Sequence, residues 1–170
     1  MALSTGSKRI KTAVLISGTG SNLKSLIKFS KLKKSPITIE LIVSNNPKSK
    51  GLHFGKIYKI RKKIFNFKKQ TTAEKEILFY LKKKKINLIC LAGFMKILSK
   101  NFIQNFDGKI LNIHPSLLPK YKGLNTHERA IINQKKVKIN KSDTPQSLAK
   151  KILIQEHKLY PKAILKIFSL

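Results

Sequence analysis

Residues 12–23, TAVLISGTGSNL, carry the pattern that decides the fold. The continuous apolar run Thr12–Ile16 has the length of a strand, and such runs suit strands that are buried on both faces of a sheet. A glycine-containing turn follows, and then a segment of helical periodicity over Asn22–Leu32. A buried strand that leads directly into a helix predicts a βαβ unit and a parallel sheet.

The same alternation continues along the chain. Further strands are expected at Ile37–Val43, near Ile64–Phe67, and at Leu88–Ala92, Ile110–Ile113 and Val137–Ile139, and further helices at Gly51–Tyr58, Thr72–Lys84, Leu98–Phe106 and Thr126–Ile132. A long last helix opens at Thr144–Pro145, because threonine caps helices and proline suits the first helical position. We therefore predict a single α/β domain over residues 1–170, with a Rossmann-like, mostly parallel twisted sheet, helices on both faces and a long C-terminal helix.

The composition is that of a soluble globular protein. The chain has 170 residues, of which 41% are hydrophobic and 26% charged, enough to bury one proper core. Its longest uncharged apolar stretch, Ile86–Met95, is well short of the roughly 18 residues that cross a bilayer. Cys90 is the single cysteine, so no intrachain disulfide can form. We expect a cytoplasmic protein with no signal peptide.

The net charge of +30 raises the question of an anionic partner. All of the 37 basic residues except Arg9, Arg61 and Arg129 are lysines, whereas proteins that read nucleic acids favour the bidentate fork of arginine. We interpret the charge as compositional bias that a phosphate-bearing small molecule would tolerate well, and we expect no membrane or nucleic-acid partner. A basic, non-catalytic nucleic-acid-binding module is the alternative from another class.

The segment SGTGSNL, Ser17–Leu23, predicts an anion site. Its glycines allow a tight turn, and backbone N–H groups at the opening of a helix attract a phosphate. The spacing is not GxGxxG, which disfavours a dinucleotide. The alternative interpretation is a simple helix cap.

The segment KILNIHPSLLPKYKG, Lys109–Gly123, places two polar side chains at the end of a strand. Asn112 and His114 are two residues apart and so share one face, while Ile113 packs into the sheet. At the carboxyl edge of a parallel sheet they would face the ligand region, where an amide and an imidazole can stabilise an oxyanion and exchange a proton. Alternatively, His114 is satisfied by a local carbonyl.

The segment LAGFMKILS, Leu91–Ser99, runs from a strand through Gly93 towards a helix. Taken alone it is core sequence. Because its turn would lie beside the Asn-x-His edge, Met95–Leu98 is also a candidate wall for a flat apolar ligand.

Together, SGTGSNLKSLI, LAGFMKILS, LNIHPSLLPKYKGLNTH and QEHKLYP resemble, in order and surroundings, the folate-dependent phosphoribosylglycinamide formyltransferase family of purine synthesis. The resemblance implies transfer of a formyl group from 10-formyltetrahydrofolate, the co-substrate, to the amine of glycinamide ribonucleotide, and it implies no metal. It assigns the substrate to Gly20, Ser21, Asn22 and Glu156, and catalysis to Asn112 and His114.

The same resemblance assigns the folate to Met95, Lys96, Ile97 and Leu98, together with Gln70 and Asn112. The family usually has arginine at the position of Lys96, where backbone contacts make lysine tolerable. A basic residue that often contacts the folate falls at Gln70, with Lys68 and Lys69 close enough to substitute for it.

The chain departs from the family pattern between Asn133 and Gln134. Members have at this point a His-Gly-Ser/Thr-Val-His strand and an Asp-x-Gly loop, roughly 20 to 25 residues or one β-hairpin, and the missing Asp is the third catalytic residue. We expect the fold to survive this loss and activity to be impaired. Whether Asp107 or Asp143 replaces the missing carboxylate is open.

Methionyl-tRNA formyltransferase and formyltetrahydrofolate deformylase share the Asn-x-His strand and are the rival enzymes. Each normally carries a further domain for which 170 residues leave no room. The sequence predicts no oligomeric state.

Overall fold

The structure is a computed structural model that describes residues 9–113, 137, 140 and 142–169. The chain divides into two compact units, Met1–Asn112 and Ile113–Leu170. The first holds the sheet and the second holds the long helix. The expectation of one domain over residues 1–170 stays a prediction.

The first unit contains a five-stranded sheet in the order β3-β2-β1-β4-β5, and every neighbouring pair is parallel. The strands are β1 (Ile10–Ile16), β2 (Ile37–Ser44), β3 (Arg61–Ile64), β4 (Leu88–Leu91) and β5 (Lys109–Asn112). The predicted parallel α/β sheet is confirmed.

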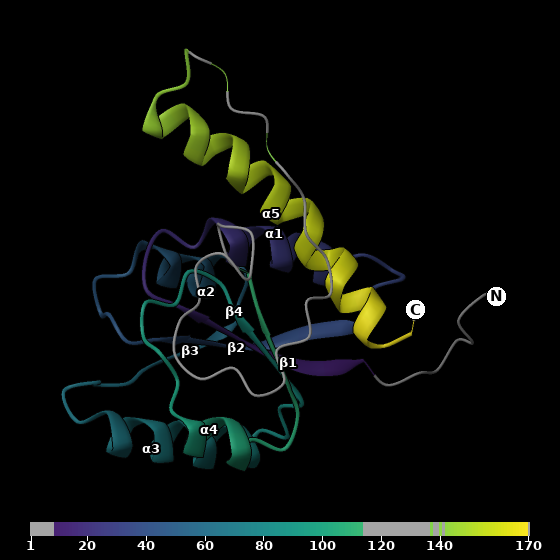
Figure 1. The fold of residues 1–170 in the computed structure, drawn as a ribbon. Coiled ribbons are helices and arrows are strands. Elements are labelled where there is room, and N and C mark those ends of the chain that lie inside the picture. The colour runs from purple at the N-terminus through teal and green to yellow at the C-terminus, as the bar shows by residue number, and fades with distance from the viewer. Residues whose placement is uncertain (1–8, 114–136, 138–139, 141, 170) are drawn as a thin grey trace. The chain divides into compact units, whose positions relative to one another are not determined.

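The helices of this unit form the crossovers that parallel strands require. They are α1 (Ser21–Ser30), the 3₁₀ turn η1 (Lys50–Leu52), α2 (His53–Ile57), α3 (Gln70–Lys83) and α4 (Lys100–Asn105). Figure 1 shows α1 and α2 on one side of the sheet and α3 and α4 on the other. This arrangement follows from right-handed crossovers, because the chain moves from β1 to β3 in one direction and then returns to β4 and β5.

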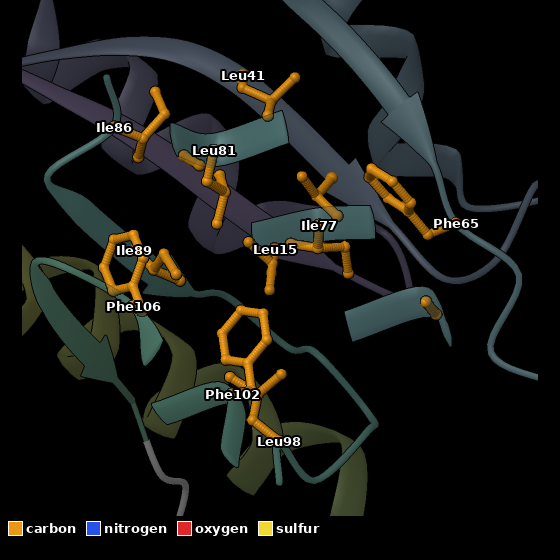
Figure 2. Close-up of a cluster of buried hydrophobic side chains, with 13 residues drawn as sticks. Leu15, Leu41, Phe65, Ile77, Leu81, Ile86, Ile89, Leu98, Phe102 and Phe106 are labelled. Carbon is orange, nitrogen blue, oxygen red and sulfur yellow. The ribbon is translucent and has the colours of Figure 1, made fainter. Parts of the chain in front are cut away.

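The core on the α3 side is built from alternate residues of the strands. Leu15 of β1, Leu41 of β2 and Ile89 of β4 point into it and meet Ile77 of α3 and Phe102 of α4, as Figure 2 shows. Each of these side chains is almost fully buried. The intervening strand residues face the other side because the side-chain period of a strand is two, which explains why these strands read as continuous apolar runs.

Several predicted bounds differ from the structure by two residues or more, and β3 and α4 show the physical reasons. β3 lies at Arg61–Ile64 rather than near Ile64–Phe67. It is an edge strand whose residues are all exposed, so it has no apolar pattern that would mark it. Lysine and arginine protect such edges from pairing with other chains. The apolar pattern placed the strand too late in the sequence, because Phe65, which follows β3, is buried in the core. α4 begins after Ser99, whose side chain caps it, so its predicted start at Leu98 is two residues early.

The second unit contains α5 (Pro145–Ile167). The predicted start is confirmed, since Thr144 and Ser147 form a reciprocal capping box and Pro145 occupies the first turn. The predicted helix Thr126–Ile132 lies outside the described residues, as does the predicted strand Val137–Ile139 except for Val137, which is in no regular element. None of the helices described here is long and apolar enough to cross a membrane.

Candidate functional site

The strand order reverses between β1 and β4, the two neighbours at the centre of the sheet. From β1 the chain moves to β2 on one side, and from β4 it moves to β5 on the other. Open parallel sheets bind their ligands at such a switch point, beyond the carboxyl ends of the strands. The segments that leave β1 and β4 there are those that contain SGTGSNL and AGFMKIL.

The loop after β1 is shaped by a close approach of two glycines. Gly20 caps α1 with a φ of 76°, a left-handed conformation that glycine adopts without strain. A Cβ built on Gly20 would lie 2.7 Å from Cα of Gly51, on η1. Gly18 and Thr19 are exposed, and no described atom lies within 4 Å of a Cβ built on Gly18. The loop is therefore backed by protein at Gly20 and open at Gly18.

The loop is held by the segment that follows β2. The hydroxyl of Ser49 and the backbone N–H of Gly51 both donate to the carbonyl oxygen of Gly18, at 2.7 and 3.0 Å. The side-chain amide of Asn46 donates to the carbonyl oxygen of Ser17 at 3.2 Å. These bonds turn the carbonyl groups of Ser17 and Gly18 towards the segment that follows β2. The first backbone N–H groups of a helix have no acceptor inside the helix itself. An anion at the opening of α1 would meet donors.

Ser17 joins this loop to the turn after β4. Its backbone N–H donates to the carbonyl oxygen of Gly93 at 3.1 Å, and its hydroxyl accepts from the backbone N–H of Met95 at 2.8 Å. The same hydroxyl donates to Oδ1 of Asn45. The candidate phosphate loop and the candidate folate wall are thus directly hydrogen-bonded to each other.

The turn after β4 presents apolar side chains to solvent. Met95 is 79% exposed and Ile97 65% exposed, and Lys96 is exposed between them. Leu98 differs, because it is 8% exposed and packs in the core near Phe102 (Figure 2). Leu98 therefore anchors the turn, and of the four predicted wall residues the three before it project outwards.

Gln70, the first residue of α3, lies against this turn. Its side-chain amide donates to the carbonyl oxygen of Ile97 at 2.7 Å and to Oε1 of Glu74 at 2.8 Å. The two hydrogens of that amide are thus directed at protein acceptors. Lys68 and Lys69, which immediately precede it, are exposed.

The remaining predicted site residues are placed as follows. Asn112 is the exposed last residue of β5 and pairs with Leu91 at the end of β4, so it lies at the same edge of the sheet. His114 lies outside the described residues. Asn22 is buried in the first turn of α1, with Ser21 half-buried before it. Glu156 lies on α5 and is half-buried.

Asp143 is used by the cap of α5. Its carboxylate accepts from the backbone N–H of Asn140 at 2.8 Å, the hydroxyl of Ser147 at 2.8 Å and Nζ of Lys151 at 2.7 Å. These hydrogen bonds, that of Asn140 first, lower the pKa of Asp143 from 3.8 to about 2. A carboxylate held in this way is a poor proton acceptor at neutral pH. Asp107, the other candidate, is exposed after α4.

Sequence reasoning included Ser17 in the predicted anion site but missed that it joins the two loops. It also missed the other residues that hold these loops, namely Asn45, Asn46, Ser49 and Glu74. The three in the segment after β2 carried a usable signal, since polar side chains at the carboxyl end of a central strand face the ligand region of such sheets. Glu74 also carried one, as a carboxylate beside the apolar positions Ala73 and Ile77 of a core helix.

A comparison with protein families identifies the chain. The formyl transferase family matches residues 10–133, a range that includes the whole sheet and both loops. The chain belongs to this family.

Named relatives agree with the family match. The chain is 38% identical to the phosphoribosylglycinamide formyltransferase of Haemophilus influenzae, over 91% of this chain and 85% of that protein. It is 36% identical to the human trifunctional purine biosynthetic protein adenosine-3, over 95% of this chain. The match spans 19% of that longer protein.

Solved structures confirm the fold. The crystal structure of phosphoribosylglycinamide formyltransferase from Brucella melitensis superimposes with a TM-score of 0.86 at 35% identity, covering 94% of this chain and 96% of that one. The corresponding structure from Anaplasma phagocytophilum gives 0.83, also at 35% identity, over 92% and 85% of the two chains.

Proposed function

We propose that this formyl transferase binds glycinamide ribonucleotide and 10-formyltetrahydrofolate side by side and transfers the formyl group to the ribonucleotide amine, in purine biosynthesis. The observation that carries the proposal is a pair of hydrogen bonds, one from the backbone N–H of Ser17 to the carbonyl oxygen of Gly93 and one from the backbone N–H of Met95 to the Ser17 hydroxyl. They join a helix-opening anion loop to an exposed apolar turn at the switch point of the sheet. A phosphorylated amine at the loop and a flat folate at the turn would therefore bind next to each other.

In this proposal the ribonucleotide phosphate lies at Gly20, Ser21 and Asn22. The backbone amides there donate to its oxygens, and the positive end of the α1 dipole attracts its charge. Lys48 and Lys50 flank Ser49, which bonds to this loop, and add positive charge nearby. The family resemblance also assigns Glu156, on α5, to the ribonucleotide.

The folate would lie along Met95, Lys96 and Ile97, with Leu98 and Gln70 fixing the turn from behind. Burying the exposed Met95 and Ile97 side chains under a flat ring would remove apolar surface from water, which favours binding by about 25 cal/mol per Å². Asn112, at the end of β5, and His114, two residues further along the chain, would polarise the formyl carbonyl and take up the proton that the attacking amine releases.

We further propose that turnover is impaired because the hairpin with the third catalytic Asp is missing. The family match ends at residue 133. The alignment with the Haemophilus influenzae enzyme runs over 180 positions but uses 91% of a 170-residue chain, so it contains positions at which this chain has no residue. The end of the family match supports a break after Asn133, and the alignment length supports the absence of a segment that the relative has. The loss of one member of a cooperating catalytic set costs several orders of magnitude in rate.

Titration calorimetry of the purified protein with glycinamide ribonucleotide tests the assignment. Binding heat at micromolar to millimolar ligand is expected, and its absence at millimolar ligand would count strongly against the phosphate site. His114→Ala should abolish any residual formyl transfer, whereas unchanged turnover would show that another group moves the proton. Cell fractionation should place the protein in the cytoplasm.

A gel shift with RNA at physiological salt separates the alternative suggested by the +30 charge. Tight RNA binding that resists salt, together with no ribonucleotide binding, would favour a nucleic-acid-binding module over the transferase.

A further inference from the structure

Glu74 is a buried carboxylate in a chain that has few acidic residues. The whole sequence contains 7 Asp and Glu residues, and Glu74, on α3, is 3% exposed. Its neighbours on the buried side of the helix, Ala73 and Ile77, belong to the hydrophobic core. A charge in such a position is costly unless hydrogen-bond donors satisfy it.

The donors come from the turn after β4 and from the start of α3. The backbone N–H of Ser99 donates to Oε1 of Glu74 at 2.9 Å, and the Ser99 hydroxyl donates to Oε2. The side-chain amide of Gln70 donates to Oε1 at 2.8 Å and also to the carbonyl oxygen of Ile97 at 2.7 Å. The carboxylate thus holds Ser99 directly, and Gln70, which it also bonds, holds Ile97. We call Gln70, Glu74 and Ser99 the carboxylate clamp.

The clamp holds one end of a turn whose other end is held by Ser17. The backbone N–H of Met95 bonds to Ser17 at one end of the turn, and the clamp holds the other end. The side chains of Met95 and Ile97 on this turn are 79% and 65% exposed. Burial of large apolar side chains lowers the free energy, so such side chains tend to turn inwards. Leu98 already fills the core position beneath the turn, so two polar anchors and one apolar anchor keep the flanking side chains outward.

We propose that Glu74 is a positioning residue that holds the Met95–Leu98 wall in the conformation that binds the folate. The proposal rests on the proposed function, because it takes this wall as the folate seat. Glu74 is 3% exposed and lies behind the turn, so it would not contact the folate directly. It acts through Ser99 and Gln70, which hold the turn in place. A turn that is already anchored loses less conformational freedom when the ligand binds.

Glu74→Ala and Glu74→Gln test the proposal, with Glu76→Ala as the matched control. Glu76 is an exposed carboxylate on the same helix, so its removal changes the charge equally and leaves the clamp intact. Calorimetry with 10-formyltetrahydrofolate alone, and separately with glycinamide ribonucleotide, gives the two affinities without turnover.

Glu74→Ala should weaken folate binding about tenfold or more, because hydrogen bonds to a charged group are among the stronger ones. Ribonucleotide binding should stay within about twofold, because the clamp is at the end of the turn away from Ser17. Glu74→Gln should recover part of the affinity, since its carbonyl oxygen can still accept from Ser99. Unchanged folate affinity, or an equal loss for both ligands, would overturn the proposal.

Hydrogen exchange distinguishes failure of the clamp from failure of the proposed function. The Ser99 amide should exchange at least about tenfold faster in Glu74→Ala than in the Glu76→Ala control, and equal exchange would overturn the clamp. Wild-type protein that gives no heat with folate would overturn the folate seat itself, even if exchange at Ser99 responds. If Glu74→Ala does not fold, Gln70→Ala removes the Ile97 contact from an exposed position and must itself weaken folate binding for the proposal to stand.

Discussion

Replacing Gly20 with alanine should destabilise the protein strongly, because two separate costs meet at this residue. The φ of Gly20 is 76°, and holding an alanine in the left-handed region costs about 1–2 kcal/mol. Its Cβ would lie 2.7 Å from Cα of Gly51, and such overpacking against backbone costs about 1–3 kcal/mol more. The free energy of unfolding should therefore fall by about 2–5 kcal/mol, a large share of the total for a domain of this size.

Two further glycines separate these costs. Gly93 has a φ of 71° with no described atom within 4 Å of a Cβ built on it, so Gly93→Ala should show the conformational cost alone, about 1–2 kcal/mol. Gly18 lies in similarly open space and is not among the described residues with positive φ. Gly18→Ala should change stability by less than about 1 kcal/mol, because neither cost applies there.

Urea unfolding followed by circular dichroism measures the series. With a slope of about 2 kcal/mol per M, Gly20→Ala should lower the midpoint by about 1–2.5 M. The shift should be smaller for Gly93→Ala and smallest for Gly18→Ala. If Gly20→Ala unfolds within about 0.5 kcal/mol of the wild type, the contact with Gly51 does not support the loop. An equal loss in all three variants would refute the separation into two costs.

Three other predictions concern the loops and the last helix. Leu98→Ala should lower the free energy of unfolding in urea by about 2–4 kcal/mol, because Leu98 is a core residue. Ile97→Ser should leave stability within about 0.5 kcal/mol and weaken folate binding measured by calorimetry. The reverse pattern would contradict the orientation of the turn. Ser17→Ala should weaken ribonucleotide and folate binding together, since its hydroxyl joins the two loops; loss of one ligand alone would argue against this link. The Asp143 pKa is lowered to about 2 in the folded protein, so the stabilisation that this carboxylate provides is fully present above about pH 4 and is lost as the pH falls towards 2. Asp143→Asn should make the first-turn amides of α5 exchange faster at pH 7 and should remove the part of their pH dependence that lies between about pH 4 and 2. Identical exchange in both proteins would refute the role of Asp143 in the cap.

The amino-acid sequence alone predicted the class of fold, most strand positions and the two loops that matter. Local patterns suffice here, because apolar runs such as Leu88–Leu91 are set by burial on both faces, and capping signals such as Thr144–Pro145 act within one turn of helix. The sequence was misleading at β3, where the edge position reverses the usual rule that strands are apolar, and at Leu98, which belongs to a binding motif but is buried in the core.

Tertiary structure alone decided which side chains hold the site together. The bonds of Ser17 to Asn45 and Met95, and of Glu74 to Ser99, join residues that are 28, 78 and 25 positions apart. Such pairs have no local signature, because a hydroxyl or carboxylate finds its partner only when the strand order brings two loops to the same edge of the sheet. The sequence therefore determined what each segment is, and packing determined which segments meet.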